Sequence, residues 1–280
     1  MRIVALFLLS MFALSAQPAV AASTPGMSSL EQRLSYLIAG KSADVGIAAL
    51  DLDTGETVSV KGNTPFPMAS TVKVAIAALY LAQVDHGRRS LDDTIKGQSA
   101  RSLMSRMLIH SDNRATDILL ADLGGPTAVH DWLADNGVKG LRVDRTIAQL
   151  LSAKRDLWDR RDSSTPEAMV DLLRRIYKAE LIKPASRNYL LQVMAQCETG
   201  KNRIKALLPG VPVEHKTGTL NGLADDVGFL TMPDGHRVAV AIFTRGGSDR
   251  PRTIAEAARA IYDGFKAALS WPFAPALSAQ

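Results

Sequence analysis

Ser70 and Lys73 lie three residues apart in the stretch FPMASTVKVAIAALYLAQV, where a proline-containing segment leads into a long apolar run. Residues three apart on a helix share a face, so the lysine amine can point at the serine hydroxyl. A serine hydroxyl is a weak nucleophile until a base takes its proton, and a desolvated lysine can be that base. A helix N-terminus adds backbone N–H groups suited to a developing oxyanion. The pair therefore predicts a serine nucleophile with a lysine base.

Two further polar triplets follow in the chain and could complete such a site. Residues 111–113 are S-D-N, a hydroxyl, a carboxylate and an amide ahead of a predicted helix; alone, they would suggest an ordinary N-cap. Residues 216–218 are K-T-G on a predicted strand, where a lysine alone would suggest protection of a sheet edge. S-x-x-K, S-D-N and K-T-G in this order form the motif set of class A β-lactamases and penicillin-binding proteins. Together, the three motifs favour one shared catalytic site.

The elements that must position these motifs are predicted from apolar periodicity and turn residues. Helical spacing predicts a helix at 29–40, and alternation around DTG predicts a β-hairpin at 44–63. Further helices are predicted at 70–86, 101–109, 113–123, 126–136, 166–180, 185–196 and 252–269, and strands at 211–220, 223–232 and 236–245. The polar stretch between Arg145 and Asp162 is predicted to be an ordered loop, anchored in the core by Trp158.

Strands at both ends of the chain flank the block of helices. This order predicts an α/β (α+β) fold in which helices flank an antiparallel sheet formed from both termini, with an all-helical insertion between. We expect a signal peptide at residues 1–21 and a single domain at 22–280. Its α/β part would cover about 28–66 plus 206–270, and its helical part about 67–205. A cleft between the two parts is the natural place for a site.

The N-terminus has the pattern of a secretory signal peptide. Arg2 precedes the apolar run Ile3–Leu14, and Ala19-Val20-Ala21 supplies a small-residue cleavage site. The run is too short to cross a bilayer as a helix, and no cysteine at the cleavage site suggests a lipid anchor. We therefore expect a periplasmic or secreted bacterial protein without a membrane anchor.

Composition argues against several other classes of function. The net charge is +5, but acidic residues lie among the basic ones and no basic run carries aromatics, so nucleic-acid binding is not expected. Cys197 is the single cysteine, which rules out an intramolecular disulfide. The histidines lack zinc-binding spacing, so neither a metal nor another cofactor is predicted. His110 and His215 precede the motifs, but a packed or solvated role is favoured. We expect a monomer that acts on a small molecule.

The chain resembles class A β-lactamases over nearly all of its mature length. The matching stretches are FPMASTVKV, HSDNRATDILLADLGGPTAV, RVDR, DSSTPEAM and KTGT, followed by the closing strands and helix. The resemblance implies an acyl-serine hydrolase that acts on β-lactams or on D-alanyl-D-alanine-like peptides. It implies that Ser70 is the nucleophile, that Lys73 is a base or proton relay, and that Ser111 passes a proton to the leaving nitrogen.

The resemblance also implies which residues would bind the substrate. Asn113 would bind a substrate amide, while Lys216 and Thr217 would hold the substrate carboxylate. The backbone N–H groups of the nucleophile and of Thr219 would form the oxyanion hole. Arg237 and Arg245 flank a predicted strand next to the K-T-G strand, and either is a further candidate for carboxylate binding; Arg237 is the one that we select. A positive site of this kind matches an anionic substrate.

One feature of the family is missing between S-D-N and K-T-G. Class A enzymes carry a glutamate there, in an E-x-x-L-N pattern soon after an arginine, and it activates the water that hydrolyses the acyl-enzyme. Counted forward from Arg145 this position is Ile147, and counted back from Asp162 it is near Gln149. The segment contains no glutamate. Acylation is therefore expected to proceed, whereas deacylation lacks an evident base and is expected to be inefficient.

Two carboxylates of this segment, Asp156 and Asp159, would replace the glutamate only if the loop folds inward. As charged loop residues they are expected to be solvated instead. Alternatives to an inefficient β-lactamase therefore stay open. One is a penicillin-binding-protein-like D,D-peptidase or an esterase on the same site, and the other is a β-lactam-binding protein with no turnover.

The segment between S-x-x-K and S-D-N is also short. Ser70 and Ser111 are 41 positions apart, below the usual spacing of the family, and no aromatic residue lies between Tyr80 and Trp132. The family's loop at this point usually carries an aromatic at the wall of the cleft. We therefore expect a more open cleft on that side.

Overall fold

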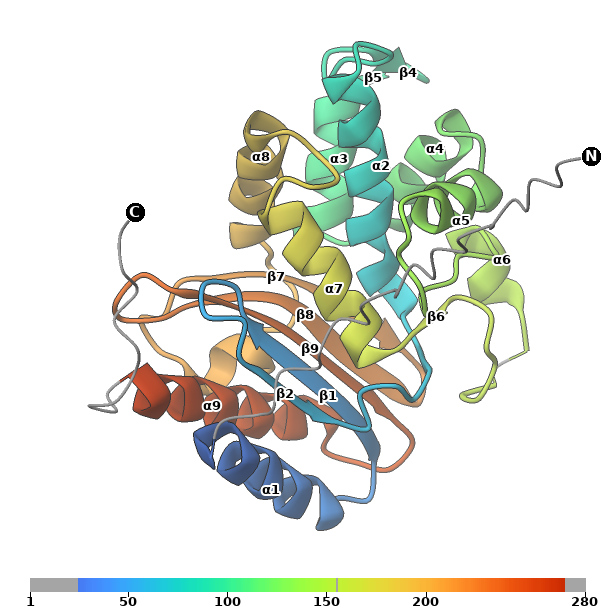
Figure 1. Cartoon of the computed structure of the whole chain (residues 1–280). Helices are drawn as coiled ribbons and strands as arrows, with labels where there is room; N and C mark the ends of the chain where they lie inside the picture. The colour runs from blue at the N-terminus through green and yellow to red at the C-terminus, as the bar shows by residue number, and fades with distance from the viewer. Residues whose placement is uncertain (1–24, 155, 270–280) are drawn as a thin grey trace, which may run out of the picture.

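A five-stranded antiparallel sheet joins the two ends of the described chain (Figure 1). The computed structural model describes residues 25–154 and 156–269, so the predicted signal peptide lies outside the described residues. The strands are β1 (Asp44–Asp51), β2 (Thr57–Val60), β7 (Val213–Leu220), β8 (Leu223–Thr231) and β9 (Arg237–Arg245). Their order in the sheet is β2-β1-β9-β8-β7. Because β1 pairs with β9, the prediction of a sheet formed from both ends of the chain is confirmed.

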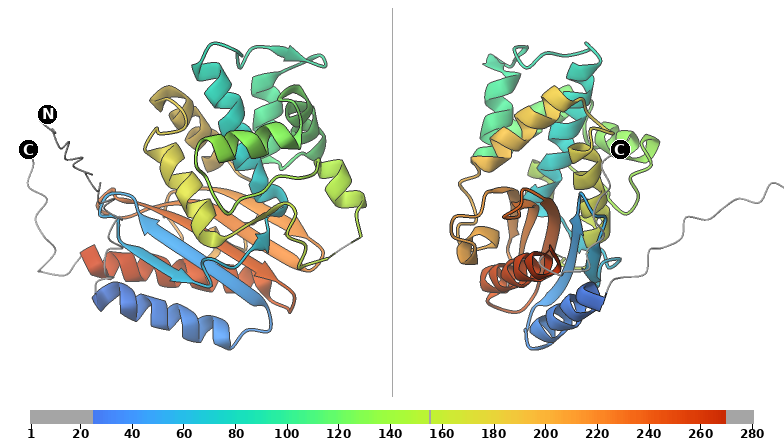
Figure 2. Two further views of the ribbon diagram at one scale, coloured as in Figure 1. Left: turned by 45° about the vertical axis from the view of Figure 1, so that its right-hand side comes forward. Right: turned by 60° about the vertical axis from the view of Figure 1, so that its left-hand side comes forward.

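Helices cover both faces of this sheet, as Figure 2 shows. α1 (Pro25–Ala39) and α9 (Arg250–Leu269) lie on one face, beside the short turn η2 (Ile204–Leu207). α7 (Pro166–Tyr177) packs on the other face against β1, β8 and β9. The other helical elements are η1 (Ala69–Val72), α2 (Lys73–Asp85), α3 (Ala100–Ile109), α4 (Asn113–Asp122), α5 (Pro126–Asp135), α6 (Ile147–Ser152) and α8 (Pro184–Ala195). The α/β architecture with a helical insertion is therefore as predicted.

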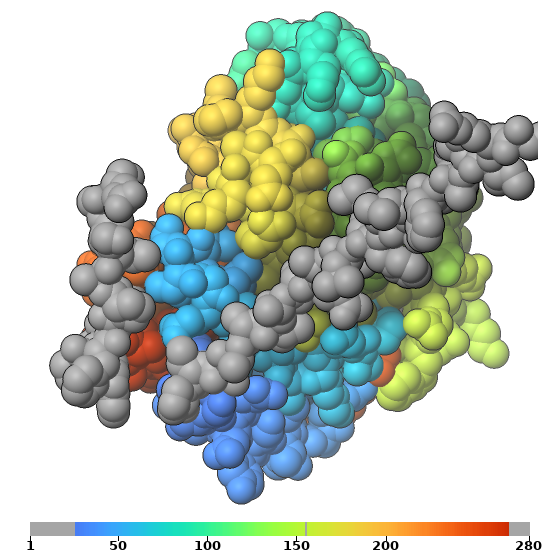
Figure 3. All heavy atoms as spheres, in the orientation of Figure 1, coloured from blue at the N-terminus to red at the C-terminus, as the bar shows by residue number. Residues whose placement is uncertain are grey.

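Alternation along each strand divides the apolar residues between two cores. On β9, Val240 packs in the core beneath α1 and α9, whereas Ala241 packs in the core that includes the helical part. Ile47 and Ala48 of β1 divide in the same way. The central strands are therefore apolar on both faces, which explains their nearly unbroken hydrophobic sequence. In the space-filling view, the blue N-terminal residues and the red C-terminal helix lie together below the green and yellow helical part (Figure 3).

Two pairs of very short strands fix the connections around the helical part. β3 (Phe66–Pro67) pairs with β6 (Ser163–Ser164), which ties the segment before Ser70 to the end of the 145–162 segment. β4 (Thr94–Ile95) and β5 (Gln98–Ser99) form a hairpin in the short connection from α2 to α3. These pairings were not predicted, because two-residue strands have no periodicity to detect.

Most helix boundaries fall within three residues of the prediction, because local caps define them. Thr165 caps α7 by accepting a hydrogen bond from Ala168 N–H at 3.1 Å, and Pro166 occupies the first helical position. Within residues 25–154 and 156–269, no helix is both long enough and apolar enough to span a membrane.

Candidate active site

Ser70 lies in the tight turn η1, between β3 and the buried helix α2. One helix was predicted from residue 70, but the α-helix begins only at Lys73, so the two residues belong to successive elements. Ala69, just before the serine, has a left-handed φ of 44°, which a non-glycine residue adopts only under constraint. The N–H of Met68 donates to Asp162 O at 2.9 Å and helps to hold this turn. Ser70 is half-buried, and its hydroxyl makes no hydrogen bond with another described residue.

Lys73 is fully buried, and its amine is hydrogen-bonded to the S-D-N motif. Nζ donates to the carbonyl and hydroxyl oxygens of Ser111 at 2.7 and 3.1 Å and to Asn113 Oδ1 at 2.8 Å. Burial, and next the charge of Lys216, lower the pKa of Lys73 to about 7, although two nearby aspartates oppose this shift. The neutral amine is therefore well populated near neutral pH, as a general base requires.

Ser111 lies between two lysines that are far apart in the sequence. Its Oγ accepts hydrogen bonds from Lys73 Nζ at 3.1 Å and from Lys216 Nζ at 2.9 Å. Both lone pairs of the hydroxyl are thus occupied, so its own hydrogen can donate in a third direction. Asp112, the next residue, caps α4 by accepting from Ala115 N–H at 2.8 Å. The S-D-N motif therefore serves as an N-cap and as part of a polar site at the same time.

The K-T-G motif lies on β7, at the edge of the sheet. Lys216 is fully buried, and its Nζ also donates to Thr217 O at 2.9 Å. Burial lowers the pKa of Lys216 to about 8, even though nearby acidic groups oppose the shift. Thr217 Oγ1 lies 2.5 Å from Thr199 Oγ1, and Thr219 is exposed at the end of the motif. Through the two lysines, the structure brings S-x-x-K, S-D-N and K-T-G together.

Arg203 adds a further cation that the sequence reasoning missed. This residue precedes η2 and is only 7% exposed. Its guanidinium donates to Gly218 O and Asp225 O, each at 2.8 Å, and to Thr219 Oγ1 at 2.5 Å. These contacts fix the arginine alongside the K-T-G strand. No local signal marks it, because it is one of several basic residues in GKNRIK and only tertiary contacts distinguish it.

The structure separates Arg237 from the other predicted site residues, which corrects its assignment. β9 is not next to β7, because β8 lies between them. Lys216 is level with Ala241 on β9, and Arg237 lies four residues from that point, roughly 13 Å along the strand. Its guanidinium forms an ion pair with Glu214 instead. Arg237 is therefore part of the packing at the far end of the sheet.

A short helix, α6, lies within the predicted loop segment 145–162. Thr146 and Gln149 form a capping box at its start, and the carboxylate of Asp117 accepts from Ile147 N–H at 2.7 Å. Gln149 is exposed and engaged in the cap, whereas Ile147 is only 4% exposed. Of the two positions considered for the missing glutamate, Ile147 is therefore the one that faces inward. A helix of one or two turns leaves too weak a pattern to be predicted.

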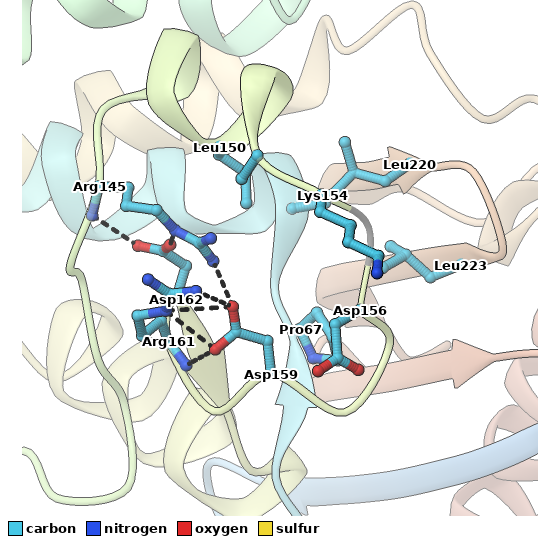
Figure 4. A pocket seen from close by; sticks show the side chains of 12 residues that line it. Pro67, Arg145, Leu150, Lys154, Asp156, Asp159, Arg161, Asp162, Leu220 and Leu223 are labelled. Atoms are coloured by element: carbon cyan, nitrogen blue, oxygen red, sulfur yellow. Dashed lines mark hydrogen bonds and ion pairs between the residues drawn. The ribbon is translucent and has the colours of Figure 1, made fainter.

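The two aspartates of this segment line a pocket beneath it (Figure 4). Asp159 accepts hydrogen bonds from Arg161, which lower its pKa to about 2, and it also pairs with Arg145. A carboxylate held at so low a pKa is a weak base. Asp156 is exposed and accepts from the N–H of Trp158 at 2.8 Å, as a turn residue commonly does.

Trp158 does not anchor the segment in the core, contrary to the prediction. The side chain is 65% exposed, and the guanidinium of Arg245 lies 3.6 Å from the centroid of its ring. Arg245 also lies over Phe66 and forms an ion pair with Asp44 at 2.8 Å. A buried arginine of the sheet, stacked on the tryptophan, therefore connects this segment to the sheet.

Asp162 holds the two ends of the 145–162 segment together. Its carboxylate accepts from Arg145 Nε at 2.5 Å, from Arg145 N–H at 3.0 Å and from Asp144 N–H at 2.7 Å. We expect Asp162→Asn to lower the free energy of unfolding by about 2 kcal/mol, because Arg145, whose side chain is 13% exposed, loses a charged hydrogen bond and keeps only its ion pair with Asp159. Asparagine tolerates the left-handed φ of 51° at this position, so the loss of stability measures the effect of removing the negative charge and not of straining the backbone. Urea unfolding measures it.

Asp156→Asn is the matched control, because Asp156 is an exposed aspartate of the same segment. Its free energy of unfolding is expected to stay within about 0.5 kcal/mol of the wild type. Equal urea midpoints for the two variants would show that the Arg145–Asp162 pair does not stabilise the segment.

Known proteins share this fold and are similar in sequence. The profile of the "Beta-lactamase enzyme family" matches residues 29–265. The extended-spectrum β-lactamase PER-1 of Pseudomonas aeruginosa is 28% identical over 267 residues, which cover 83% of this chain and 86% of that relative. A β-lactamase of Bacteroides uniformis is 30% identical, with 86% of this chain and 92% of the relative covered. The crystal structure of the TLA-1 extended-spectrum β-lactamase matches with a TM-score of 0.80 at 28% identity, over 86% of this chain and 99% of that one.

The family match extends over most of the chain and includes the three motifs that meet at Ser111. The chain therefore belongs to the β-lactamase enzyme family and is a class A β-lactamase-like serine hydrolase.

Proposed function

We propose that this protein is an exported serine β-lactamase that forms an acyl-enzyme on Ser70, opens the β-lactam ring and releases the acyl group slowly. The observation that carries the proposal is the Ser111 hydroxyl, held between the amines of two buried lysines, Lys73 and Lys216. A hydroxyl in that position can pass a proton to a leaving group and regain one from a lysine. Export rests on the signal-peptide pattern of residues 1–21.

In the proposed acylation step, the neutral amine of Lys73 takes the proton of the Ser70 hydroxyl. The serine oxygen bonds to the lactam carbonyl carbon, and collapse of the tetrahedral intermediate breaks the C–N bond. The leaving nitrogen takes the hydrogen of Ser111 Oγ, which then regains a proton from the Lys73 ammonium. The lysine is neutral again at the end, and the product is a ring-opened ester of Ser70.

The positive charges at the K-T-G strand are the reason for our assignment of the substrate carboxylate. Lys216 lies on the K-T-G strand and Arg203 lies alongside it, and we assign the carboxylate to these two cations together with Thr217. Asn113 is assigned to a substrate amide, and the N–H groups of the nucleophile and of Thr219 to the oxyanion. The substrate class that these assignments support is a small anionic β-lactam.

Slow release of the acyl group follows from the side chains near α6. Ile147 has no proton-accepting group, and Asp159, with its pKa at about 2, is a poor replacement for a glutamate. A general base contributes about 10²–10⁴-fold to such a step. The acyl-enzyme is therefore expected to accumulate during turnover.

Intact-mass analysis combined with a ring-opening assay tests the proposal. With a penicillin, the wild type is expected to carry one covalent adduct during slow, continuing ring opening, and Ser70→Ala is expected to carry none. Thermal unfolding checks that the variant is folded. Ring opening that stops after one equivalent would instead identify a β-lactam-binding protein. No adduct and no ring opening would overturn the proposal and favour a D,D-peptidase or an esterase.

The rate of acylation is expected to follow a narrow bell-shaped pH profile. Lys73 must be neutral to accept a proton, so the rate rises as pH increases through about 7. Lys216 must be charged to hold a carboxylate, so the rate falls as pH increases through about 8. The measurement is kcat/KM for adduct formation, which reports groups of the free enzyme.

An uncharged ester substrate without the carboxylate provides the control for this profile. The ester does not use the charge of Lys216, so only its rising limb is expected to remain. A carboxylate substrate whose kcat/KM does not change over this range would show that neither lysine titrates as proposed.

A further inference from the structure

Three side chains at the end of the sheet that holds Arg237 bring metal-binding atoms together. Asp51 ends β1, Asp53 lies in the turn that follows, and His236 directly precedes β9. A carboxylate oxygen of each aspartate and a ring nitrogen of the histidine all lie within 4.8 Å of one another. The histidine spacing did not predict this cluster, because the two carboxylates come from the other end of the sheet-forming sequence, 183 positions before His236 in the case of Asp53.

The ring nitrogen of His236 that faces the carboxylates has no ordinary partner. Nδ1 is buried and makes no hydrogen bond within the part of the chain that the structure describes. It lies 3.4 Å from Asp51 Oδ2 and 3.9 Å from Asp234 Oδ2. A buried polar atom normally has a partner, and a cation held between this nitrogen and the carboxylates would supply one.

Asp51 presents one oxygen to the same point. Its side chain is only 1% exposed. Oδ1 accepts from the N–H groups of Asp53 and Thr54 at 2.8 and 3.0 Å, and these bonds fix the orientation of the carboxylate. Oδ2 is the oxygen beside His236 Nδ1, and their approach at 3.4 Å is not a hydrogen bond. A carboxylate buried to this extent needs a compensating positive charge, which favours a cation at Oδ2.

The spacing and chemistry of these donors fit Zn²⁺. Tetrahedral Zn²⁺ with bonds of about 2.1 Å places neighbouring ligand atoms about 3.4 Å apart. The distance from His236 Nδ1 to Asp51 Oδ2 has this value. An imidazole ligand favours Zn²⁺ over Ca²⁺ and Mg²⁺, which bind oxygen atoms. Asp53 is exposed, so an ion has access from solvent and a water molecule can take the fourth position.

The charges around the cluster also favour a divalent cation. Asp234 adds a third carboxylate beside the ring nitrogen, and its Oδ1 accepts from the backbone N–H of His236 at 3.1 Å. Lys178 Nζ lies 3.9 Å from Asp53 Oδ1, and the backbone N–H of Arg237 donates to Asp53 Oδ2 at 3.3 Å. Three carboxylates therefore face one ammonium group at the edge of the cluster, which leaves the cluster negative.

We propose that Asp51, Asp53 and His236 form a Zn²⁺ site that joins the turn after β1 to the start of β9. The folded chain brings these ligands together and the unfolded chain does not, so binding of the ion stabilises the fold. The three residues lie outside S-x-x-K, S-D-N and K-T-G. The proposal therefore goes beyond the proposed function and does not depend on it.

Calorimetric titration of the untagged, EDTA-treated protein with ZnCl₂ tests the site. We expect one Zn²⁺ per chain with a Kd in the micromolar range, and a Tm that rises by roughly 5 °C at about 100 times that Kd. MgCl₂ at the same concentration should leave the Tm unchanged. His236→Gln and Asp53→Asn are each expected to lose both the binding heat and the rise in Tm. Asp53 is exposed, so its variant decides the test if His236→Gln does not fold.

His110→Gln is the matched control, because His110 is an exposed histidine whose ring lies 3.2 Å from a single carboxylate, that of Glu198. This variant should bind Zn²⁺ like the wild type. Unchanged stoichiometry and affinity in folded His236→Gln would refute the assignment of the ligands. If the wild type binds no Zn²⁺, His236 and Asp51 form only an ion pair and the proposal is overturned. Both results hold whether or not the protein opens a β-lactam ring.

Discussion

Replacing Ile147 by glutamate is expected to accelerate hydrolysis of the acyl-enzyme by about 10²–10⁴-fold. Ile147 is a buried residue at the start of α6, two positions after Arg145, and is one of the two positions that match the glutamate of class A enzymes. A carboxylate at this position would supply the base that activates the hydrolytic water. The measurement is the decay of the Ser70 adduct, followed by intact mass after excess β-lactam is removed.

Two control variants distinguish the effect of a proton-accepting side chain at residue 147 from the effect of a carboxylate elsewhere on α6. Ile147→Gln has nearly the shape of glutamate but is not a general base, so its adduct is expected to decay at the wild-type rate. Gln149→Glu places a carboxylate on the exposed side of α6, where the side chain of residue 149 accepts from Thr146 N–H, and no acceleration is expected. If Ile147→Glu is folded and yet releases its adduct no faster than Ile147→Gln, the missing glutamate does not explain slow deacylation.

Lys73→Arg is expected to slow acylation of Ser70 by about 10²–10⁴-fold. Arginine keeps the positive charge near Ser111 and Asn113 but stays protonated at any accessible pH, so it cannot take the proton of the serine. The measurement is the rate of adduct formation under single-turnover conditions. The rising limb of the pH profile near 7 should disappear with the amine that titrates there.

Lys201→Arg is the matched control, because Lys201 is an exposed lysine outside the three motifs. It should acylate at the wild-type rate. Lys73 is fully buried and arginine is larger, so thermal unfolding of both variants must accompany the kinetics. Acylation of a folded Lys73→Arg protein at close to the wild-type rate would exclude Lys73 as the base.

Elements with local signals were predicted well. Strand β8 was predicted at 223–232 and is found at Leu223–Thr231, since its apolar run and the PDG turn that follows define its limits. The exceptions are short segments whose shape depends on distant partners. The turn η1 is fixed by a hydrogen bond to Asp162 O, and the start of α6 by the carboxylate of Asp117. Asp162 and Asp117 both lie outside the segments that they fix, so the residue pattern of those segments gives no sign of either contact.

Residue types at short spacing pointed to side chains that the structure brings together, whereas they gave no sign of the neighbours that sheet register determines. The K-T-G motif alone could not show that Arg203 joins it or that Arg237 does not, because β8 separates β7 from β9. Likewise, counting along the chain left two positions for the missing glutamate. The capping box of α6 settles which one faces inward.

The three motifs and the order of strands, helices and strands can be read from the sequence, and they indicate the family and the sheet built from both ends. These depend on residue types and periods within a few positions. Which charged groups meet became visible in the folded chain: Lys73 and Lys216, 143 positions apart in the sequence, both donate to the hydroxyl of Ser111. It also placed His215 of β7 2.8 Å from Asp226 of β8. The reason is that pairing between distant segments sets such contacts, and local patterns do not encode that pairing.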